Sequence, residues 1–294
     1  MSFDGATVYV GSQDNKLHAV HAENGTAKWA YATGGVLDSA PLVSIDDATV
    51  CVSGGSGDNR LHAVDARTGE VQWTYCTGGT VVSSPAMSTH SAMVYVGSDT
   101  MLHAVEAGIA TAQWTHGTDG NVDSSPAVSS DGATVYVASH DRKLHAVNTL
   151  DASVQWTCPT SADVASSPTI SIDNATGLST VCIGSASPDT GLHAVHANGS
   201  RKWTHLTGGA VRSSPAVSSD GATVYVGSHD HKLHAVHAAT GEHRWNYTTN
   251  GPVESSPAVS SDGATVCVGS WDNKLYAVHA ANGSHKWNYS TVVP

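Results

Sequence analysis

Residues 255–289 read SSPAVSSDGATVCVGSWDNKLYAVHAANGSHKWNY. Strand-like stretches in this segment predict β-strands at 255–259, 265–269, 274–280 and 285–289. The first two stretches are joined through Asp262-Gly263 and the last two through Asn282-Gly283, and both dipeptides tolerate the positive φ of a tight hairpin turn. The segment therefore predicts a four-stranded antiparallel meander.

The same unit recurs from one end of the chain to the other, with one tryptophan in each copy at a period of about 42 residues. The tryptophans are Trp29, Trp73, Trp114, Trp156, Trp203, Trp245 and Trp287. The repeats run approximately over 1–35, 36–79, 80–120, 121–162, 163–209, 210–251 and 252–294. They leave no room for a separate catalytic domain, so we expect one domain whose function depends on the surface that the repeats build together.

Each predicted meander carries apolar or aromatic residues on both faces, and a lone sheet of this length cannot bury both. Radial stacking of blades around an axis covers both faces of every sheet and leaves only short edges. An open solenoid is the rival arrangement, but it needs polar capping repeats, and the first and last copies look like the middle ones. The sequence therefore predicts an all-β fold, a closed seven-bladed β-propeller of four-stranded antiparallel blades.

The innermost strand of the repeat, marked by an S-S-P-type motif, occurs six times rather than seven. Its prolines are Pro41, Pro85, Pro126, Pro168, Pro215 and Pro257. The first copy begins directly at its second strand, residues 7–11, so we expect a first blade without a full innermost strand and with at most a few of residues 291–294 in that place. An unpaired strand edge is a template for another chain. This predicts possible edge-to-edge self-association through the first blade.

The segment VYVGSHDHKLHAVHAATGEHRW, residues 224–245, resembles the PQQ-like repeat, whose tryptophan-docking signature reads A-x-D-x-x-T-G-x-x-x-W. The resemblance covers all seven copies and implies propeller blades that dock through their tryptophans. The repeat is found in quinoprotein alcohol dehydrogenases and in the bacterial outer-membrane assembly lipoprotein. The Asp position of the signature holds His21, Asp65, Glu106, Asn148, His196, His237 and His279. One fold hosts unrelated activities, so the resemblance indicates the blade type rather than the function.

Three functional classes follow. We favour a non-catalytic scaffold that binds a protein or peptide through one face and the channel mouth, because the sequence offers no nucleophile-base-orienter set and no phosphate-binding glycine loop. The resemblance suggests a PQQ-dependent dehydrogenase, but those enzymes have eight blades, a vicinal disulfide and acidic Ca²⁺ ligands, none of which can be matched here. A lectin-like propeller is the third class, and no exposed aromatic with a paired carboxylate recurs between blades. We therefore expect no enzymatic activity and no cofactor, with PQQ and Ca²⁺ only under the second class.

The residues that precede the S-S-P-type motifs vary in charge while their surroundings stay almost constant. They are Asp38, Val82, Asp123, Ala165, Arg212 and Glu254. In a propeller this position lies near one mouth of the central channel, and loops on a rigid scaffold usually carry recognition. We therefore predict a binding surface at the mouth that includes Asp38, Asp123, Arg212 and Glu254.

Histidines recur in the third strand of six copies and suggest a metal site at first sight. They are His18, His62, His103, His145, His193 and His234, with Tyr276 in the seventh copy. A metal needs several ligands about 2 Å from one ion, whereas equivalent positions of different blades lie far apart. We interpret the repeated histidine as an inter-blade packing and hydrogen-bonding residue. The denser group His229, His231, His234 and His237 has unsuitable geometry for a four-histidine site, so no metal is expected there.

The net charge limits the classes of partner, and the cysteines indicate the redox state of the cellular compartment. The formal net charge of −12 disfavours nucleic acid and anionic membranes as partners. Cys51, Cys182 and Cys267 occupy second-strand positions where other copies have tyrosine, so we expect free, mostly buried thiols and a reducing compartment. No secretory signal or membrane-spanning segment is recognisable. This favours the cytoplasm, although residues 1–5 begin inside a repeat and the natural start need not be present.

Overall fold

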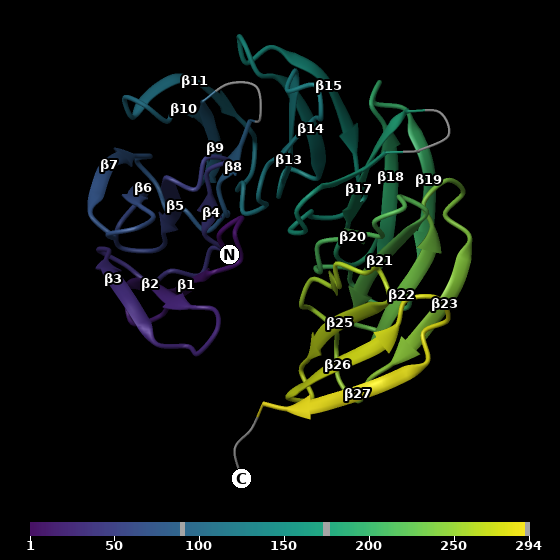
Figure 1. The fold of residues 1–294 in the computed structure, drawn as a ribbon. Coiled ribbons are helices and arrows are strands. Elements are labelled where there is room, and N and C mark those ends of the chain that lie inside the picture. The colour runs from purple at the N-terminus through teal and green to yellow at the C-terminus, as the bar shows by residue number, and fades with distance from the viewer. Residues whose placement is uncertain (89–91, 173–176, 292–294) are drawn as a thin grey trace. The chain divides into compact units, whose positions relative to one another are not determined.

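The computed structural model describes residues 1–88, 92–172 and 177–291, and these ranges contain strands and turns without a helix. None of the described residues therefore forms a helix that could cross a membrane. The chain falls into two compact units. Residues 1–139 and 147–155 form the N-terminal unit, and residues 140–146 and 156–294 form the C-terminal unit. Figure 1 shows the strands of both units.

The N-terminal unit begins with three antiparallel sheets, each ordered as in the chain. The first sheet has the strands β1 (Thr7–Ser12), β2 (Lys16–His21) and β3 (Ala27–Ala32). The second has β4 (Leu42–Val43), β5 (Thr49–Gly54), β6 (Arg60–Asp65) and β7 (Val71–Cys76). The third has β8 (Ala86–Met87), β9 (Met93–Ser98), β10 (Met101–Glu106) and β11 (Thr111–Gly117).

The boundary between the units falls within the fourth sheet, β12 (Ala127–Val128), β13 (Thr134–Ser139), β14 (Lys143–Asn148) and β15 (Val154–Pro159). The C-terminal unit continues with β16 (Thr169–Ile172), β17 (Ser179–Gly184), β18 (Gly191–His196) and β19 (Arg201–Leu206). The sixth sheet has β20 (Ala216–Val217), β21 (Thr223–Ser228), β22 (Lys232–His237) and β23 (His243–Thr248). The seventh has β24 (Ala258–Val259), β25 (Thr265–Ser270), β26 (Lys274–His279) and β27 (His285–Ser290).

These sheets are the blades of a seven-bladed β-propeller fold, as the sequence predicted. Six have four strands in meander order, and the first has three, β1-β2-β3, without an innermost strand. The expectation that C-terminal residues fill that place concerns residues 291–294, of which 292–294 lie outside the described residues, and the Thr291 N–H donates to the Asn273 carbonyl of its own blade. The glycines of the predicted hairpin turns do have positive φ, for example Gly263 at 69° and Gly283 at 70°.

The hydrophobic core of each unit lies between consecutive blades rather than within one sheet. In the N-terminal unit, Leu17 and Ala19 of the first blade pack with Val50 and Val64 of the second. In the C-terminal unit, Leu233 of the sixth blade packs with residues of the seventh in the same way. Each blade therefore completes the core of its neighbour, which is why a lone meander could not be stable.

The docking tryptophans stand on the outermost strands and reach the next blade. Within the described chain, five donate the indole N–H to a backbone carbonyl of the following blade at 2.7 to 3.1 Å: Trp29, Trp114, Trp156, Trp203 and Trp245. Trp203 and Trp245 are buried, at 9% and 8% exposure. Trp29, Trp73, Trp114 and Trp156 are half-buried, whereas Trp287 is 45% exposed and has no carbonyl acceptor among the described residues.

The innermost strands are shorter than predicted. The seventh blade was expected to have a strand over 255–259, but β24 has only two residues. The hydroxyl of Ser255 accepts a hydrogen bond from the Gly269 N–H at 2.7 Å and donates one to the Gly269 carbonyl at 3.0 Å. A side chain thus replaces the backbone ladder, and Pro257 has no N–H with which to continue it.

The second serine of the motif links neighbouring blades. In the N-terminal unit, the backbone N–H of Ser84 donates to Ser125 Oγ at 2.9 Å. In the C-terminal unit, the N–H of Ser167 donates to Ser214 Oγ, and that of Ser214 donates to Ser256 Oγ. The first serine of the motif therefore stabilises the inner edge of its own blade, and the second serine connects that blade to its neighbour.

Candidate functional site

The candidate site is built from two kinds of turn that meet at one end of each blade. In the sixth blade, the turn between β21 and β22 packs on the connection that enters the blade, because the His229 N–H donates to the Ala210 carbonyl at 2.9 Å. In the seventh blade, Trp271 makes the equivalent bond to Pro252 at 2.9 Å. We call this end of the blades the mouth end. Its turns are fixed by backbone hydrogen bonds and can hold side chains in defined positions.

A half-buried aspartate in each of these turns, Asp230 and Asp272, joins the two segments. Asp230 accepts a hydrogen bond from the Gly208 N–H at 3.1 Å and interacts with His234 Nε2 at 2.9 Å. Burial alone would raise the pKa of Asp230, but the bonds from His234, Gly208 and Ser228 hold it at about 2. The carboxylate is therefore ionised at neutral pH and acts as a fixed structural acceptor.

Two of the repeated histidines, His62 and His103, contact the preceding blade as predicted, whereas His193 hydrogen-bonds to Ser185 and Thr204 of its own blade. His62 Nδ1 lies 3.0 Å from Tyr31 Oη of the preceding blade, and His103 Nδ1 lies 3.2 Å from Tyr75 Oη. Burial lowers the pKa of His62 and His103, so both are neutral at pH 7. These side chains are committed to packing and hydrogen bonding between blades.

Two of the predicted mouth residues come together in the C-terminal unit. Arg212 Nη1 lies 3.6 Å from Glu254 Oε1, and His229 Nε2 lies 3.9 Å from the same oxygen. The Arg212 and Glu254 side chains are 52% and 32% exposed. An exposed ion pair of this kind adds little stability, so both side chains remain free to exchange partners.

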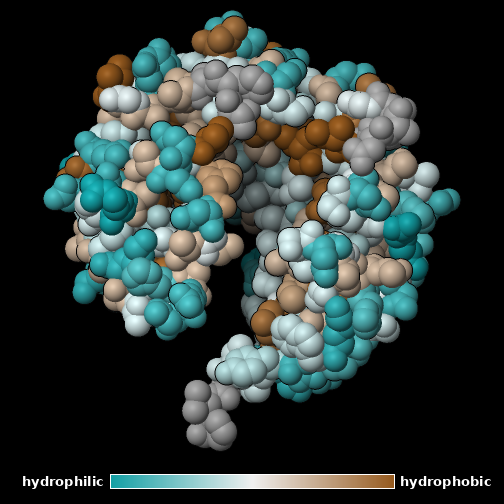
Figure 2. Space-filling view, in the orientation of Figure 1, coloured by the Kyte–Doolittle hydropathy of each residue, from teal (hydrophilic) through white to brown (hydrophobic). Residues whose placement is uncertain are grey.

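An exposed tryptophan lies beside this pair. Trp271 is 62% exposed, and its ring centroid lies 5.6 Å from that of His229. Much of the surface in Figure 2 is hydrophilic, with hydrophobic side chains gathered in a few places. We call Arg212, His229, Glu254 and Trp271 the mouth cluster. It combines an aromatic surface, a cation and a carboxylate on rigid turns.

The other predicted mouth residues differ in their surroundings. In the N-terminal unit, Asp38 is exposed and makes no ion pair with a described residue, and Asp123 is half-buried. Val82 is 38% exposed. In the C-terminal unit, Ala165 is half-buried, and nearby Asp163 forms an ion pair with Arg142, with 3.5 Å between Oδ1 and Nε. All residues of the mouth cluster belong to the C-terminal unit.

Sequence reasoning missed Trp271 as a surface residue, although a signal was present. Trp271 is the one tryptophan outside the docking series. It occupies the variable position of a Ser-x-Asp turn, where other copies have Gln13, His140 and His229. Arg212 and Glu254 were predicted as binding residues because their position varies between copies while its neighbours stay constant. The position of Trp271 in the Ser-x-Asp turn varies in the same way, so the same criterion identifies Trp271 as a candidate.

The five cysteines are free thiols, of which Cys51, Cys158 and Cys182 are buried, Cys267 is half-buried and Cys76 is exposed. Cys51 and Cys182 pair with the innermost strands at the register that Tyr95 occupies in the third blade, and burial raises the pKa of both thiols to about 12. Within the described ranges, no group of three His, Cys, Asp or Glu side chains is arranged to hold a metal ion.

Comparisons with known proteins agree with the blade architecture. The crystal structure of BamB from Moraxella catarrhalis aligns with a TM-score of 0.78 at 17% identity, over 97% of this chain and 86% of that one. The computationally designed Ika8 protein aligns with a TM-score of 0.82 at 14% identity, over 98% of this chain and 85% of that one. At these identities the alignments show the fold alone. The curated protein sequences contain no match. Residues 1–112 and 99–292 match the PQQ_2 family, and the chain therefore belongs to this family, which is described as outer membrane protein assembly factor BamB.

Proposed function

We propose that the protein is a non-catalytic scaffold that binds a protein or peptide at the mouth end of its blades. The observation that carries the proposal is the mouth cluster, in which Trp271 stands exposed beside His229 and the Arg212–Glu254 pair. Tryptophan and arginine dominate the energetic hot spots of protein interfaces. Membership of a family described as an assembly factor supports the same class of function.

The cluster suits a partner segment with an apolar or planar group next to a charge. Trp271 offers a large rigid surface at a low entropic cost, since only two side-chain torsions must be fixed. Arg212 can form bidentate bonds to a carboxylate of the partner, because its present partner is held through one atom pair at 3.6 Å. We therefore expect binding to weaken when either side chain is replaced.

A quantitative pull-down from a lysate of the source organism tests the proposal. Wild-type protein, Trp271→Ala and Arg212→Glu are compared with Leu150→Ala, which changes an 88% exposed residue in a turn at the other end of a blade. We expect at least one protein that is retained by the wild type and by Leu150→Ala and is lost from both mouth variants. If the retained set is the same for all four proteins, the mouth cluster is not the binding surface.

The absence of catalysis is a separate part of the proposal. Protein incubated with PQQ and Ca²⁺ is assayed for cofactor absorbance and for dye reduction with alcohols. We expect neither signal. Stoichiometric PQQ binding with substrate-dependent dye reduction would replace the scaffold proposal with a quinoprotein enzyme.

A further inference from the structure

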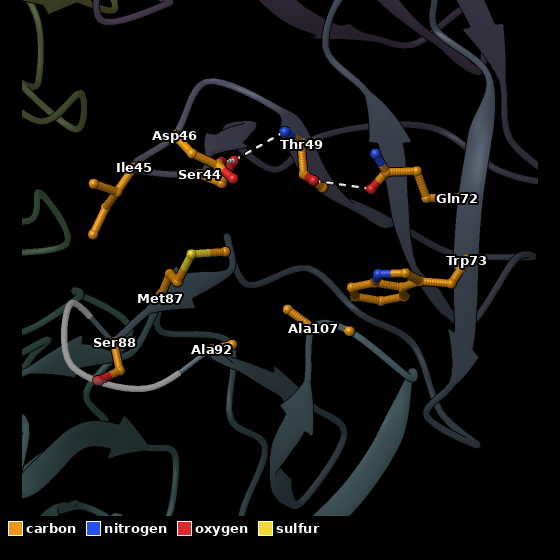
Figure 3. Close-up of a pocket in the computed structure, with 11 residues that line it drawn as sticks. Ser44, Ile45, Asp46, Thr49, Gln72, Trp73, Met87, Ser88, Ala92 and Ala107 are labelled. Carbon is orange, nitrogen blue, oxygen red and sulfur yellow. Dashed lines mark hydrogen bonds between the residues drawn. The ribbon is translucent and has the colours of Figure 1, made fainter.

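A second concave surface lies in the N-terminal unit, between the second and third blades at the end opposite the mouth turns. It has a volume of about 770 Å³, which falls in the range of ligand pockets in proteins. We call it the Trp73 groove, and its lining includes Ser44, Ile45, Asp46, Thr49, Gln72, Trp73, Met87, Ala92 and Ala107. In Figure 3, Trp73 closes one end, with Asp46 and Thr49 along one side and Met87 and Ala107 along the other.

Trp73 differs in its hydrogen bonding from the docking tryptophans of the neighbouring blades. Trp29 and Trp114, in the blades before and after it, donate their indole N–H groups to Ala66 and Thr149 of the next blade. For Trp73, no acceptor is present among the described residues, and the ring is only half-buried. The groove therefore contains a free N–H donor at the edge of an aromatic surface.

The walls of the groove are more apolar than the same positions in other blades. Ile45 is 58% exposed and stands where the fourth, sixth and seventh copies have Ser130, Ser219 and Ser261. Met87 stands where other copies have Val128, Val217 and Val259. An exposed isoleucine and a flexible thioether facing a cavity are suited to contact with an apolar group.

The groove also has a carboxylate without the cation that accompanies it in the first, sixth and seventh blades, an absence that it shares with the fourth blade, where Asp131 and Gln155 occupy the two positions. Asp4, Asp220 and Asp262 occupy the same turn position as Asp46, and each experiences the charge of a cation on the fourth strand of its blade, respectively Lys28, Arg244 and Lys286. In the second blade this position holds Gln72, which accepts from Thr49 Oγ1 at 2.9 Å.

Asp46 remains ionised, because bonds from the Ser44 hydroxyl and the Ala48 N–H hold the pKa of its carboxyl below the usual range. It is the one charged side chain among the described lining residues. A ligand that carries a positive charge would therefore meet a complementary, uncompensated charge.

We propose that the Trp73 groove binds an extended peptide segment that presents a bulky apolar side chain next to a basic one. The apolar side chain packs between Trp73, Met87 and Ala107. The basic side chain pairs with Asp46, and a peptide carbonyl accepts the free indole N–H. This ligand supplies a cation for Asp46, an acceptor for the Trp73 indole N–H and an apolar group for the groove.

The probe is the end-capped peptide Gly-Arg-Phe-Arg-Gly. Its binding is measured through the chemical shift of the Trp73 indole N–H signal in ¹H–¹⁵N spectra. The signal is assigned by its absence from a Trp73→Phe spectrum. We expect a saturable shift of this signal. Gly-Arg-Ala-Arg-Gly and Gly-Glu-Phe-Glu-Gly should bind roughly tenfold more weakly or worse, the loss that removal of an anchor side chain produces.

Two variants test the location. Ala92→Arg fills the groove, and Ala222→Arg is its matched control at the same repeat position of the sixth blade. Gln72→Lys restores the cation found at Lys202 in the fifth blade, so the fold should tolerate it. We expect both groove variants to weaken the Phe peptide at least about tenfold and the control to leave its affinity unchanged.

Several outcomes would overturn the proposal: no shift of the Trp73 signal, equal affinity of the Phe and Ala peptides, or unchanged affinity in Gln72→Lys. A shift produced by methyl glucoside but by none of the peptides would instead identify a carbohydrate site. The mouth cluster is not involved in this experiment, so its outcome is independent of the proposed scaffold function.

Discussion

Trp245 donates its indole N–H to the carbonyl of Ala280 in the next blade, at 3.0 Å. Gly283, with φ at 70°, lies directly on the same ring, and a Cβ at this glycine would approach the indole to 2.4 Å. The turn thus needs glycine both for its backbone conformation and for close contact with the tryptophan. One residue pair therefore couples the hairpin turn of one blade to the outer strand of its neighbour.

Replacement of this tryptophan should destabilise the protein. Trp245→Ala leaves a cavity between two blades and removes one of the two side-chain hydrogen bonds to the Ala280 carbonyl, and we expect a loss of about 3 to 5 kcal/mol in the free energy of unfolding. Trp287→Ala is the matched control, because Trp287 is 45% exposed, and its loss should be within about 0.5 kcal/mol. Thermal melts of both variants check this. Equal destabilisation would mean that Trp287 is docked in solution.

The first serine of the inner-strand motif should contribute through its hydroxyl alone. Ser124 is fully buried, and its Oγ donates to the Ala138 carbonyl at 2.8 Å and accepts from the Ala138 N–H at 2.9 Å. Ser124→Ala leaves both backbone groups unpaired, so we expect a loss of about 1 to 3 kcal/mol. Ser130→Ala, at an exposed position in the same blade, is the control. Denaturant unfolding of the two variants should separate them, and indistinguishable midpoints would contradict the role of this hydroxyl.

Acidification should begin to destabilise the protein as the pH falls below about 6.5. Burial lowers the pKa of His62, His103 and His193 in the folded state, whereas an unfolded histidine titrates near about 6.5. The unfolded chain therefore binds more protons in this window, so the stability present above pH 6.5 is lost as the pH falls. The aspartates whose pKa is lowered contribute stability that is lost only below about pH 4, outside the range in which the histidines titrate.

The variant His103→Tyr tests this assignment. Tyr276 occupies the same position in the seventh blade and donates to Asp272 at 2.5 Å, so the fold accepts tyrosine there. We expect a smaller drop in melting temperature between pH 7.5 and pH 5.5 for the variant than for the wild type. An unchanged difference would show that His103 does not contribute to the acid sensitivity.

Features that repeat along the chain were predictable from the sequence, because seven copies show which positions are fixed. The blade count, the glycine turns, the interface role of the third-strand histidines and the second-strand register of Cys51 all follow from alignment of the copies. The short inner strands did not follow, because the serine hydroxyl that replaces a backbone pair at Ser255 leaves no trace in the pattern of apolar residues.

The candidate sites were harder to predict, because they depend on departures from the repeat that come together only in space. Trp271 and Glu254 lie on different turns of one blade, and His229 reaches them from the blade before. The Trp73 groove likewise needs Ile45 and Gln72 from one blade and Met87 from the next. Each substitution alone is unremarkable in the sequence, and only the fold shows that they share a surface.

The edge of the first blade should mediate self-association. Val10 in β1 is 47% exposed, whereas Val52, Val96 and Val226 at the same register of other blades are fully buried. In those blades an innermost strand pairs with the second strand, but β1 forms the edge of its three-stranded sheet, with backbone groups available for another strand.

Val10→Lys should suppress this association, since a lysine on an edge strand opposes further pairing. Light scattering after size exclusion should give a wild-type mass that rises above 30.2 kDa with concentration, whereas Val10→Lys remains at 30.2 kDa. Leu150→Lys adds the same charge at an 88% exposed turn and should associate like the wild type. A wild-type protein that is monomeric throughout, or equal association of the two lysine variants, would show that this edge is not a pairing surface in solution.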